Sequence, residues 1–256
     1  MKRNSIRDVI YVHLNEKDHY VLSYGIEFKE FVQSLGDSIN HLLLLKHQFD
    51  DADFNMHTML EYVPRKRVMK LAEEDVYGYG DFCWIDFEEM EGLDEVPGQV
   101  LAELLYLGHV KDPLRPPFYS YLGNSYAYLA RDDGWLNKTY YRDLNQFYKL
   151  LSQIIPMKLG SGKPEKGLLS LKRKKIYPSV DQHLLLSLKG FMSEGMVLSV
   201  KGIVQNRFRM ELPIWVIGDF ANMDDVYEEY EKSSKKPCDA KLIFDKKSQE
   251  WKIRSS

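Results

Sequence analysis

The stretch FYSYLGNSYAYLARDDGWLNKTYY, residues 118–141, says most about the fold of this chain. It contains Gly123-Asn124 and Asp133-Gly134, two dipeptides that favour two-residue hairpin loops because they accept the positive φ of such turns. The residues between and around these turns alternate in the manner of strands. The pattern predicts a three-stranded meander, with strands near 118–122, 125–131 and 135–141.

Two-residue loops would also fix the strand register. Counting outward from the loops places Tyr126 opposite both Tyr121 and Tyr141, and Tyr128 opposite Tyr119. Because side chains alternate between the faces of a strand, five tyrosines should share one face. This predicted tyrosine row consists of Tyr119, Tyr121, Tyr126, Tyr128 and Tyr141. Such a row either packs in a core or forms a contact surface, and the sequence leaves both interpretations open. As a contact surface, the row would make all five tyrosines binding residues.

A dense acidic run follows the predicted buried strand at 81–87. Its members are Asp86, Glu88, Glu89, Glu91, Asp94 and Glu95. The simple interpretation is a solvated loop before a helix at 97–107, where negative charge is favourable. The alternatives are a divalent-cation site, an acid/base pair, or a surface that repels nucleic acid and attracts a basic protein. For the basic partner we single out Glu88, Glu89 and Glu91 beside the tyrosine row.

The composition limits the class of protein. The chain has 256 residues, of which 44% are hydrophobic and 29% charged, so a disordered or fibrous protein is excluded. Its two cysteines, Cys83 and Cys238, lie too far apart in sequence to suggest a disulfide framework or a cysteine-based zinc site. No apolar run approaches the ~20 residues of a membrane helix. We expect a soluble cytoplasmic protein without membrane contact.

Charge divides the chain into two unlike parts. Residues 156–256 hold 19 Lys and Arg against 13 Asp and Glu, a net charge of +6, whereas residues 1–155 hold 16 against 25, a net charge of −9. The Gly-, Pro- and Lys-rich segment 156–167 has the composition of a linker or exposed loop. We therefore expect an acidic α+β domain at 1–155, which contains the meander, and a basic α+β domain at 168–256.

Local patterns predict the class of each segment. Strands are expected at 8–14 and 19–24, a helix at 27–35 that ends at Gly36, and a helix from Asp143 that ends at Pro156. The apolar segment 39–49 is compatible with a helix or a buried strand, and we favour the helix. Strands and helices do not alternate regularly, so we expect an α+β fold with mainly antiparallel sheets and a few packed helices. The two parts defined by charge are expected to be its two subdomains.

Two further groups suggest other functions. His47, Asp51 and His57 could share a divalent metal if a helix runs through Asp51, which would suit a metal-dependent hydrolase. Lys172-Arg173-Lys174-Lys175, beside Ile176 and Tyr177, could contact the phosphates of a nucleic acid. Both groups have simpler interpretations as solvated loops.

The chain lacks the motifs of common enzyme classes. It has no HExxH, no GxSxG and no complete phosphate loop, since Pro164 follows Lys163 where Ser or Thr should stand. We expect a non-enzymatic interaction module of the inhibitor, immunity or regulatory kind that binds a basic protein partner. No cofactor is expected, and whether the protein is an enzyme stays open.

Overall fold

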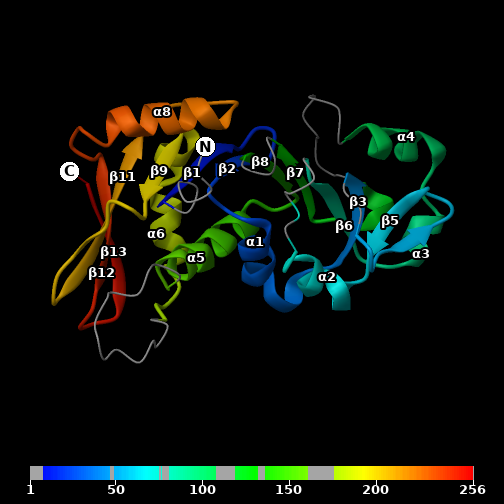
Figure 1. Ribbon diagram of the computed structural model, residues 1–256, viewed down its shortest axis with the longest axis horizontal. Coiled ribbons are helices and arrows are strands. Elements are labelled where there is room, and N and C mark those ends of the chain that lie inside the picture. The colour runs from blue at the N-terminus through cyan, green and yellow to red at the C-terminus, as the bar shows by residue number, and fades with distance from the viewer. Residues whose placement is uncertain are drawn as a thin grey trace.

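The computed structural model describes residues 8–46, 49–74, 76, 81–107, 119–131, 136–160 and 176–255. In this part of the chain, thirteen strands form one antiparallel sheet that runs along the molecule, with helices packed on both faces (Figure 1). The strand order is β13-β12-β11-β9-β1-β2-β8-β7-β6-β3-β5-β4, and β10 pairs with β11. The α+β class with an antiparallel sheet is therefore confirmed.

The elements follow one another without the regular alternation of a doubly wound fold. The strands are β1 (Val9–Asn15), β2 (Tyr20–Tyr24), β3 (His41–Lys46), β4 (Asp53–Asn55), β5 (Leu60–Val63), β6 (Cys83–Phe87), β7 (Tyr126–Arg131), β8 (Leu136–Tyr141), β9 (Met196–Ser199), β10 (Val204–Gln205), β11 (Arg209–Val216), β12 (Ala240–Asp245) and β13 (Glu250–Ser255). The helices are α1 (Phe28–Leu35), α2 (Arg65–Leu71), α3 (Glu91–Asp94), α4 (Gly98–Leu107), α5 (Asn145–Gly160), α6 (Gln182–Ser187), α7 (Lys189–Ser193) and α8 (Met223–Ser233), and short 3₁₀ turns are η2 (Gly36–Ser38) and η3 (Ser120–Leu122).

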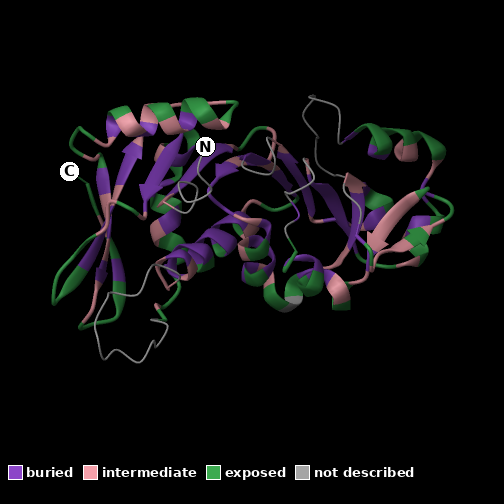
Figure 2. Cartoon of the chain, in the orientation of Figure 1, coloured by how far each residue is buried: buried purple, intermediate pink, exposed green. Residues whose placement is uncertain are grey.

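The core is layered around this sheet. One face packs against α1, α2, α5, α6 and α7, and it holds the largest group of buried apolar side chains. The other face is covered in two places, by α8 at one end and by α3 and α4 toward the other end. Figure 2 shows the consequence, because the central strands are buried along most of their length while the helices are exposed on their outer sides.

The sheet continues across the predicted domain boundary. β1, near the start of the chain, pairs with β9, so that Val12 lies opposite Met196. Side chains from both predicted domains, such as Phe31 and Leu198, belong to the same core. The division into 1–155 and 168–256 is thus not a gap in the sheet, and the assignment of two domains stays a prediction.

The predicted end of the last N-terminal helix is wrong. α5 continues through Pro156 to Gly160, so the first five residues of the predicted linker 156–167 are helical, while 161–167 lie outside the described residues. Proline has no N–H for the carbonyl four residues earlier, which here belongs to Ser152. That carbonyl instead accepts a 3.0 Å hydrogen bond from the backbone N–H of Val180. Val180, which is distant in sequence, thus supplies the hydrogen bond that Pro156 cannot donate to the Ser152 carbonyl.

The meander is confirmed in its second half and wrong in its first. β7 and β8 pair with the predicted register, Tyr126 opposite Tyr141 and Tyr128 opposite Thr139, although the turn Asp133-Gly134 lies outside the described residues. Residues 120–122 of the predicted strand 118–122 form the 3₁₀ turn η3 instead, and residue 118 lies outside the described residues. β7 takes β6 as its other neighbour. Gly123 ends η3 with a left-handed φ of 59°, so its turn-forming character was recognised but its partner strand was not.

Residues 41–46 of the segment 39–49 form a strand and not the favoured helix, while residues 47 and 48 lie outside the described residues. β3 is an interior strand between β6 and β5, and its residues Leu42, Leu43 and Leu44 are buried. Their side chains face the helices on the two sides of the sheet in alternation. A strand covered on both faces shows a continuous apolar run, which removes the alternation that would identify it from sequence.

Candidate interaction surface and adjoining pocket

Three of the five predicted row tyrosines share one face and are core residues. Tyr126, Tyr128 and Tyr141 are buried in the main core. The Tyr128 ring stacks on Trp84 with 5.2 Å between centroids, and the Tyr126 and Tyr141 rings meet edge to face at 5.8 Å. Side chains buried in this way contribute to packing, so we correct their assignment as surface binding residues.

The other two tyrosines do not join this face. Tyr119 is buried in the separate apolar cluster beneath α3 and α4, whereas Tyr121 is 52% exposed. They depart from the row because residues 120–122 form a 3₁₀ turn, in which side chains do not alternate between two faces. Of the five tyrosines, Tyr121 alone offers a large surface to a partner.

The exposed tyrosine lies against the acidic run. Glu88, Glu89 and Glu91 are all exposed, and the N–H of Glu88 donates to the Leu122 carbonyl at 3.0 Å. Gly92 of α3 approaches so closely that a Cβ there would lie 2.7 Å from the Tyr121 carbonyl oxygen. Two segments distant in sequence therefore form one patch, which we call the acidic surface: Glu88, Glu89, Glu91 and Tyr121.

A buried carboxylate fixes the backbone beneath the acidic surface. Asp86 accepts hydrogen bonds from the backbone N–H groups of Ser125 (2.8 Å) and Tyr126 (2.7 Å) and from the side-chain amide of Asn40 (2.9 Å). Burial raises the pKa of Asp86 to about 6, although these hydrogen bonds oppose the shift. Asp86 was grouped with the exposed acidic run, but its place between Ile85 and Phe87 in an apolar strand was the signal of a different role.

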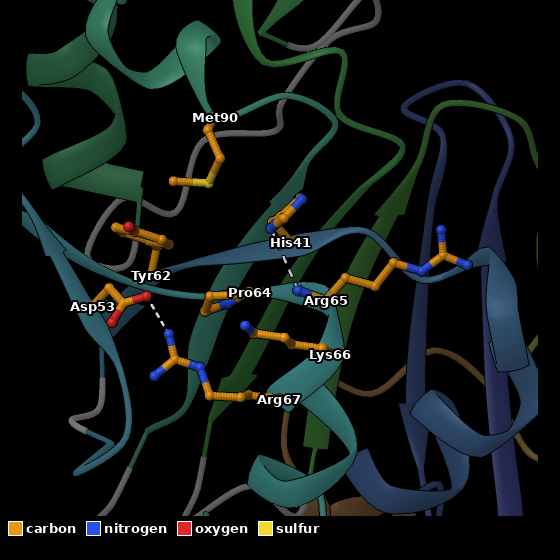
Figure 3. Close-up of a pocket in the computed structure, with 8 residues that line it drawn as sticks. All are labelled: His41, Asp53, Tyr62, Pro64, Arg65, Lys66, Arg67 and Met90. Carbon is orange, nitrogen blue, oxygen red and sulfur yellow. Dashed lines mark hydrogen bonds and ion pairs between the residues drawn. The ribbon is translucent and has the colours of Figure 1, made fainter.

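A pocket of about 630 Å³ opens next to this surface, between α2, β4–β5 and the turn before α3 (Figure 3). Its lining residues are His41, Asp53, Tyr62, Pro64, Arg65, Lys66, Arg67 and Met90. Sequence reasoning missed it, and the run Arg65-Lys66-Arg67 was the available signal.

His41 forms the rear of this pocket in a defined orientation. Its ring stacks on Phe87, with 5.1 Å between centroids, and its Nδ1 accepts the Arg65 backbone N–H at 3.4 Å. Burial lowers the pKa of His41, Glu89 acts to raise it, and Arg65 lowers it further. The imidazole is therefore neutral near pH 7, with its proton on Nε2.

The predicted metal group is only partly placed. Asp51 forms an ion pair with Lys70, and the ring Nε2 of His57 lies 2.8 Å from the Val96 carbonyl, which requires an N–H at that nitrogen. His47 lies outside the described residues, and among those described no three His, Cys, Asp or Glu side chains are placed to hold a metal. The metal-dependent hydrolase stays an untested prediction.

Comparisons with known proteins give no relative. No family model, no curated protein and no solved structure matches this chain. Within the described residues, no helix has both the length and the apolar character to cross a membrane.

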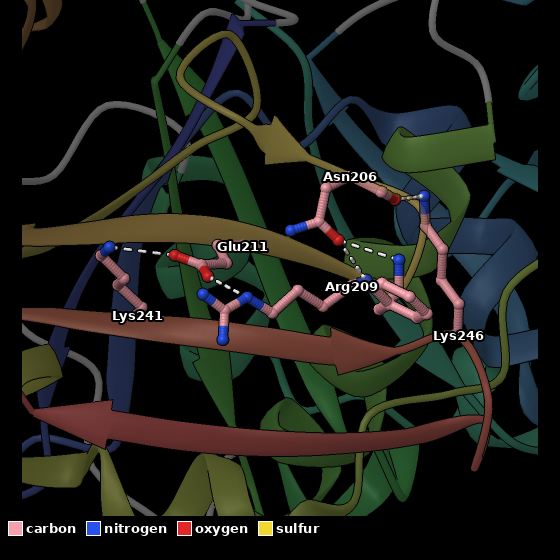
Figure 4. Close-up of polar contacts among 6 residues, drawn as sticks. Asn206, Arg209, Glu211, Lys241 and Lys246 are labelled. Atoms are coloured by element: carbon pink, nitrogen blue, oxygen red, sulfur yellow. Dashed lines mark hydrogen bonds and ion pairs between the residues drawn. The ribbon is translucent and has the colours of Figure 1, made fainter.

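The basic C-terminal part carries its charges in mixed networks. On the open face of β11 and β12, Glu211 lies between Arg209 (2.6 Å) and Lys241 (2.9 Å), and Lys246 donates to the Asn206 carbonyl at 2.7 Å (Figure 4). The two cations beside Glu211 share its charge and are not both free for phosphates. Lys172–Lys175 lie outside the described residues, so nucleic-acid binding also stays a prediction.

Proposed function

We propose that this protein is a non-enzymatic interaction module that binds a basic protein partner through the acidic surface. The observation that carries this proposal is the meeting of the exposed Tyr121 with Glu88, Glu89 and Glu91 on two segments joined by backbone contacts. Interfaces of this kind combine an aromatic anchor with charges at the rim.

The support beneath the surface favours binding with little rearrangement. Asp86 fixes the backbone at Ser125 and Tyr126, and the Asn124 side chain accepts the Tyr119 N–H at 3.0 Å. A surface held in its bound conformation loses less entropy when the partner binds. The acidic surface therefore has the conformation for binding before the partner arrives.

Affinity capture with the purified chain, followed by binding kinetics with each captured protein, tests the proposal. The test variant reverses Glu88, Glu89 and Glu91 to Lys. We expect it to slow association with a basic partner, with a defect that shrinks as salt rises, because exposed charges act mainly by long-range steering. Tyr121→Ala should instead speed dissociation at every salt concentration.

Matched controls separate this surface from general charge effects. Reversing the exposed Glu194, Asp224 and Glu250 to Lys changes the net charge equally at distant sites, and Tyr106→Ala removes a side chain that is 68% exposed on α4. Equal defects in the test and control variants would contradict the proposed surface, as would a partner that is not basic.

A further inference from the structure

The pocket beside α2 is rich in hydrogen-bond donors. Figure 3 shows the Lys66 amine and the Arg67 guanidinium directed toward Asp53 and Tyr62, whereas the Arg65 side chain runs the other way. The Tyr62 hydroxyl keeps its proton, because burial and the charge of Asp53 raise its pKa. Donors from Lys66 and Arg67 thus face one space.

The acceptors of the pocket are already engaged. Asp53 is the single carboxylate among the lining residues, and it pairs with Arg67, which also donates to the Asp51 carbonyl. These contacts hold the guanidinium of Arg67 in place. They do not involve Lys66, and no ion pair of Lys66 is found in the described part of the chain. The Nε of Arg67 is also buried without a hydrogen-bond partner there. An acceptor-rich, negatively charged ligand would complement this arrangement.

The walls of the pocket are flat and apolar. Tyr62 and His41 both contact Phe87, edge to face at 6.1 Å for Tyr62 and stacked for His41, while Pro64 and Met90 complete the lining. The volume of about 630 Å³ lies within the range of about 300–1,000 Å³ of small-molecule sites, which combine apolar walls with a few placed polar groups.

We propose that this pocket binds a small aromatic phosphate of mononucleotide size, with Lys66 and Arg67 contacting the phosphate and Tyr62, Pro64 and Met90 contacting the flat body. Two carboxylates outside the lining oppose an anion, because Glu89 acts electrostatically on His41 and Asp94 acts on Tyr62. A phosphate offers more acceptor oxygens and more negative charge to Lys66 and Arg67 than a carboxylate does, which favours phosphate.

Calorimetric titration with AMP tests the site. Three related probes separate the contribution of the phosphate to the affinity from that of the flat body. We expect AMP to bind more tightly than inorganic phosphate, which lacks the flat body, than adenosine, which lacks the charge, and than benzoate, which carries one charge. An adenosine affinity equal to that of AMP would overturn the phosphate contact. A phosphate affinity equal to that of AMP would overturn the flat-body contact, and tighter benzoate binding would overturn the choice of phosphate. No AMP binding would overturn the whole proposal.

Variants then locate the site. Lys66→Gln should weaken AMP binding about tenfold or more, or ~1.4 kcal/mol, whereas Lys66→Arg should keep most of the affinity. Glu89→Gln should strengthen binding by removing the repulsive charge. The control Lys189→Gln, on the distant α7, should leave AMP affinity unchanged. All variants are exposed at the surface, and circular dichroism checks that they fold. Equal affinities of Lys66→Gln and the parent protein would overturn the assignment of this pocket.

Discussion

The ammonium nitrogen of Lys158 lies 2.8 Å from both carboxylate oxygens of Glu30, which joins the end of α5 to α1. The side chains are 2% and 17% exposed, so the pair is shielded from water. The same carboxylate accepts the N–H of Glu27 at 2.9 Å and so also caps α1. Glu30 thereby connects the start of one helix to the end of another.

Removing one partner of this pair should destabilise the protein strongly. Lys158→Met removes the cation that neutralises the shielded Glu30 carboxylate. Such changes lower the free energy of unfolding by about 3–5 kcal/mol. Urea denaturation measures the loss. The double variant Lys158→Met with Glu30→Gln should recover part of it, and a double variant less stable than the single one would contradict the coupling.

Truncation of Tyr128 should reveal its core position. Tyr128→Ala removes a ring that is 0% exposed and stacks on Trp84, so we expect a loss of about 3–5 kcal/mol in the free energy of unfolding. Tyr121→Ala is the matched control on the surface and should change that free energy by no more than about 0.5 kcal/mol. Similar losses in the two variants would contradict the separation of core and surface tyrosines.

Asp86 should make stability fall as the pH rises. Its pKa is about 6 in the folded protein and lower in the unfolded chain, so the folded state holds the proton more tightly between about pH 4 and 6. As the pH rises from 4 to above 6, this residue should lower the free energy of unfolding by about 3 kcal/mol. Denaturation of the Asp86→Asn variant across pH 4–7 should lack this slope, and parallel curves for variant and parent would argue against it.

Glu211 should have the opposite pH dependence. Its hydrogen bond to Lys241 is the main cause that lowers its pKa, and Arg209 contributes as well. The resulting stability is present above about pH 4.3 and is lost as the pH falls through the depressed pKa of the folded state. Glu211→Gln should therefore be less stable than the parent at pH 7, with a gap that closes in acid. Thermal melts at pH 7 and pH 3 measure both values.

Local sequence patterns predicted several single elements and one hairpin register, but not the pairing of strands from distant segments. The register of β7 and β8 was predicted because alternation and a two-residue loop leave few alternatives. The pairing of β7 with β6 was not predicted, because β6 comes from a distant segment and no local pattern encodes the contact. The same holds for Pro156, whose place inside α5 depends on Val180.

The candidate sites show a similar division. Exposure of Glu88, Glu89 and Glu91 followed from their charge, whereas the burial of Asp86 depended on Asn40 and on backbone groups far along the chain. The pocket beside α2 unites β3, β5, α2 and the turn at Met90, so its members had no common sequence pattern.

The pairing of β1 with β9 has a consequence for biosynthesis. A ribosome adds about 5–20 residues per second, and β1 emerges long before Met196 exists to pair with Val12. During that interval one edge of β1 presents open backbone donors and acceptors, which other strands can recruit. We therefore expect this edge of the nascent chain to need shielding until β9 is made. A fragment that stops at residue 155 would keep this edge open permanently and should aggregate.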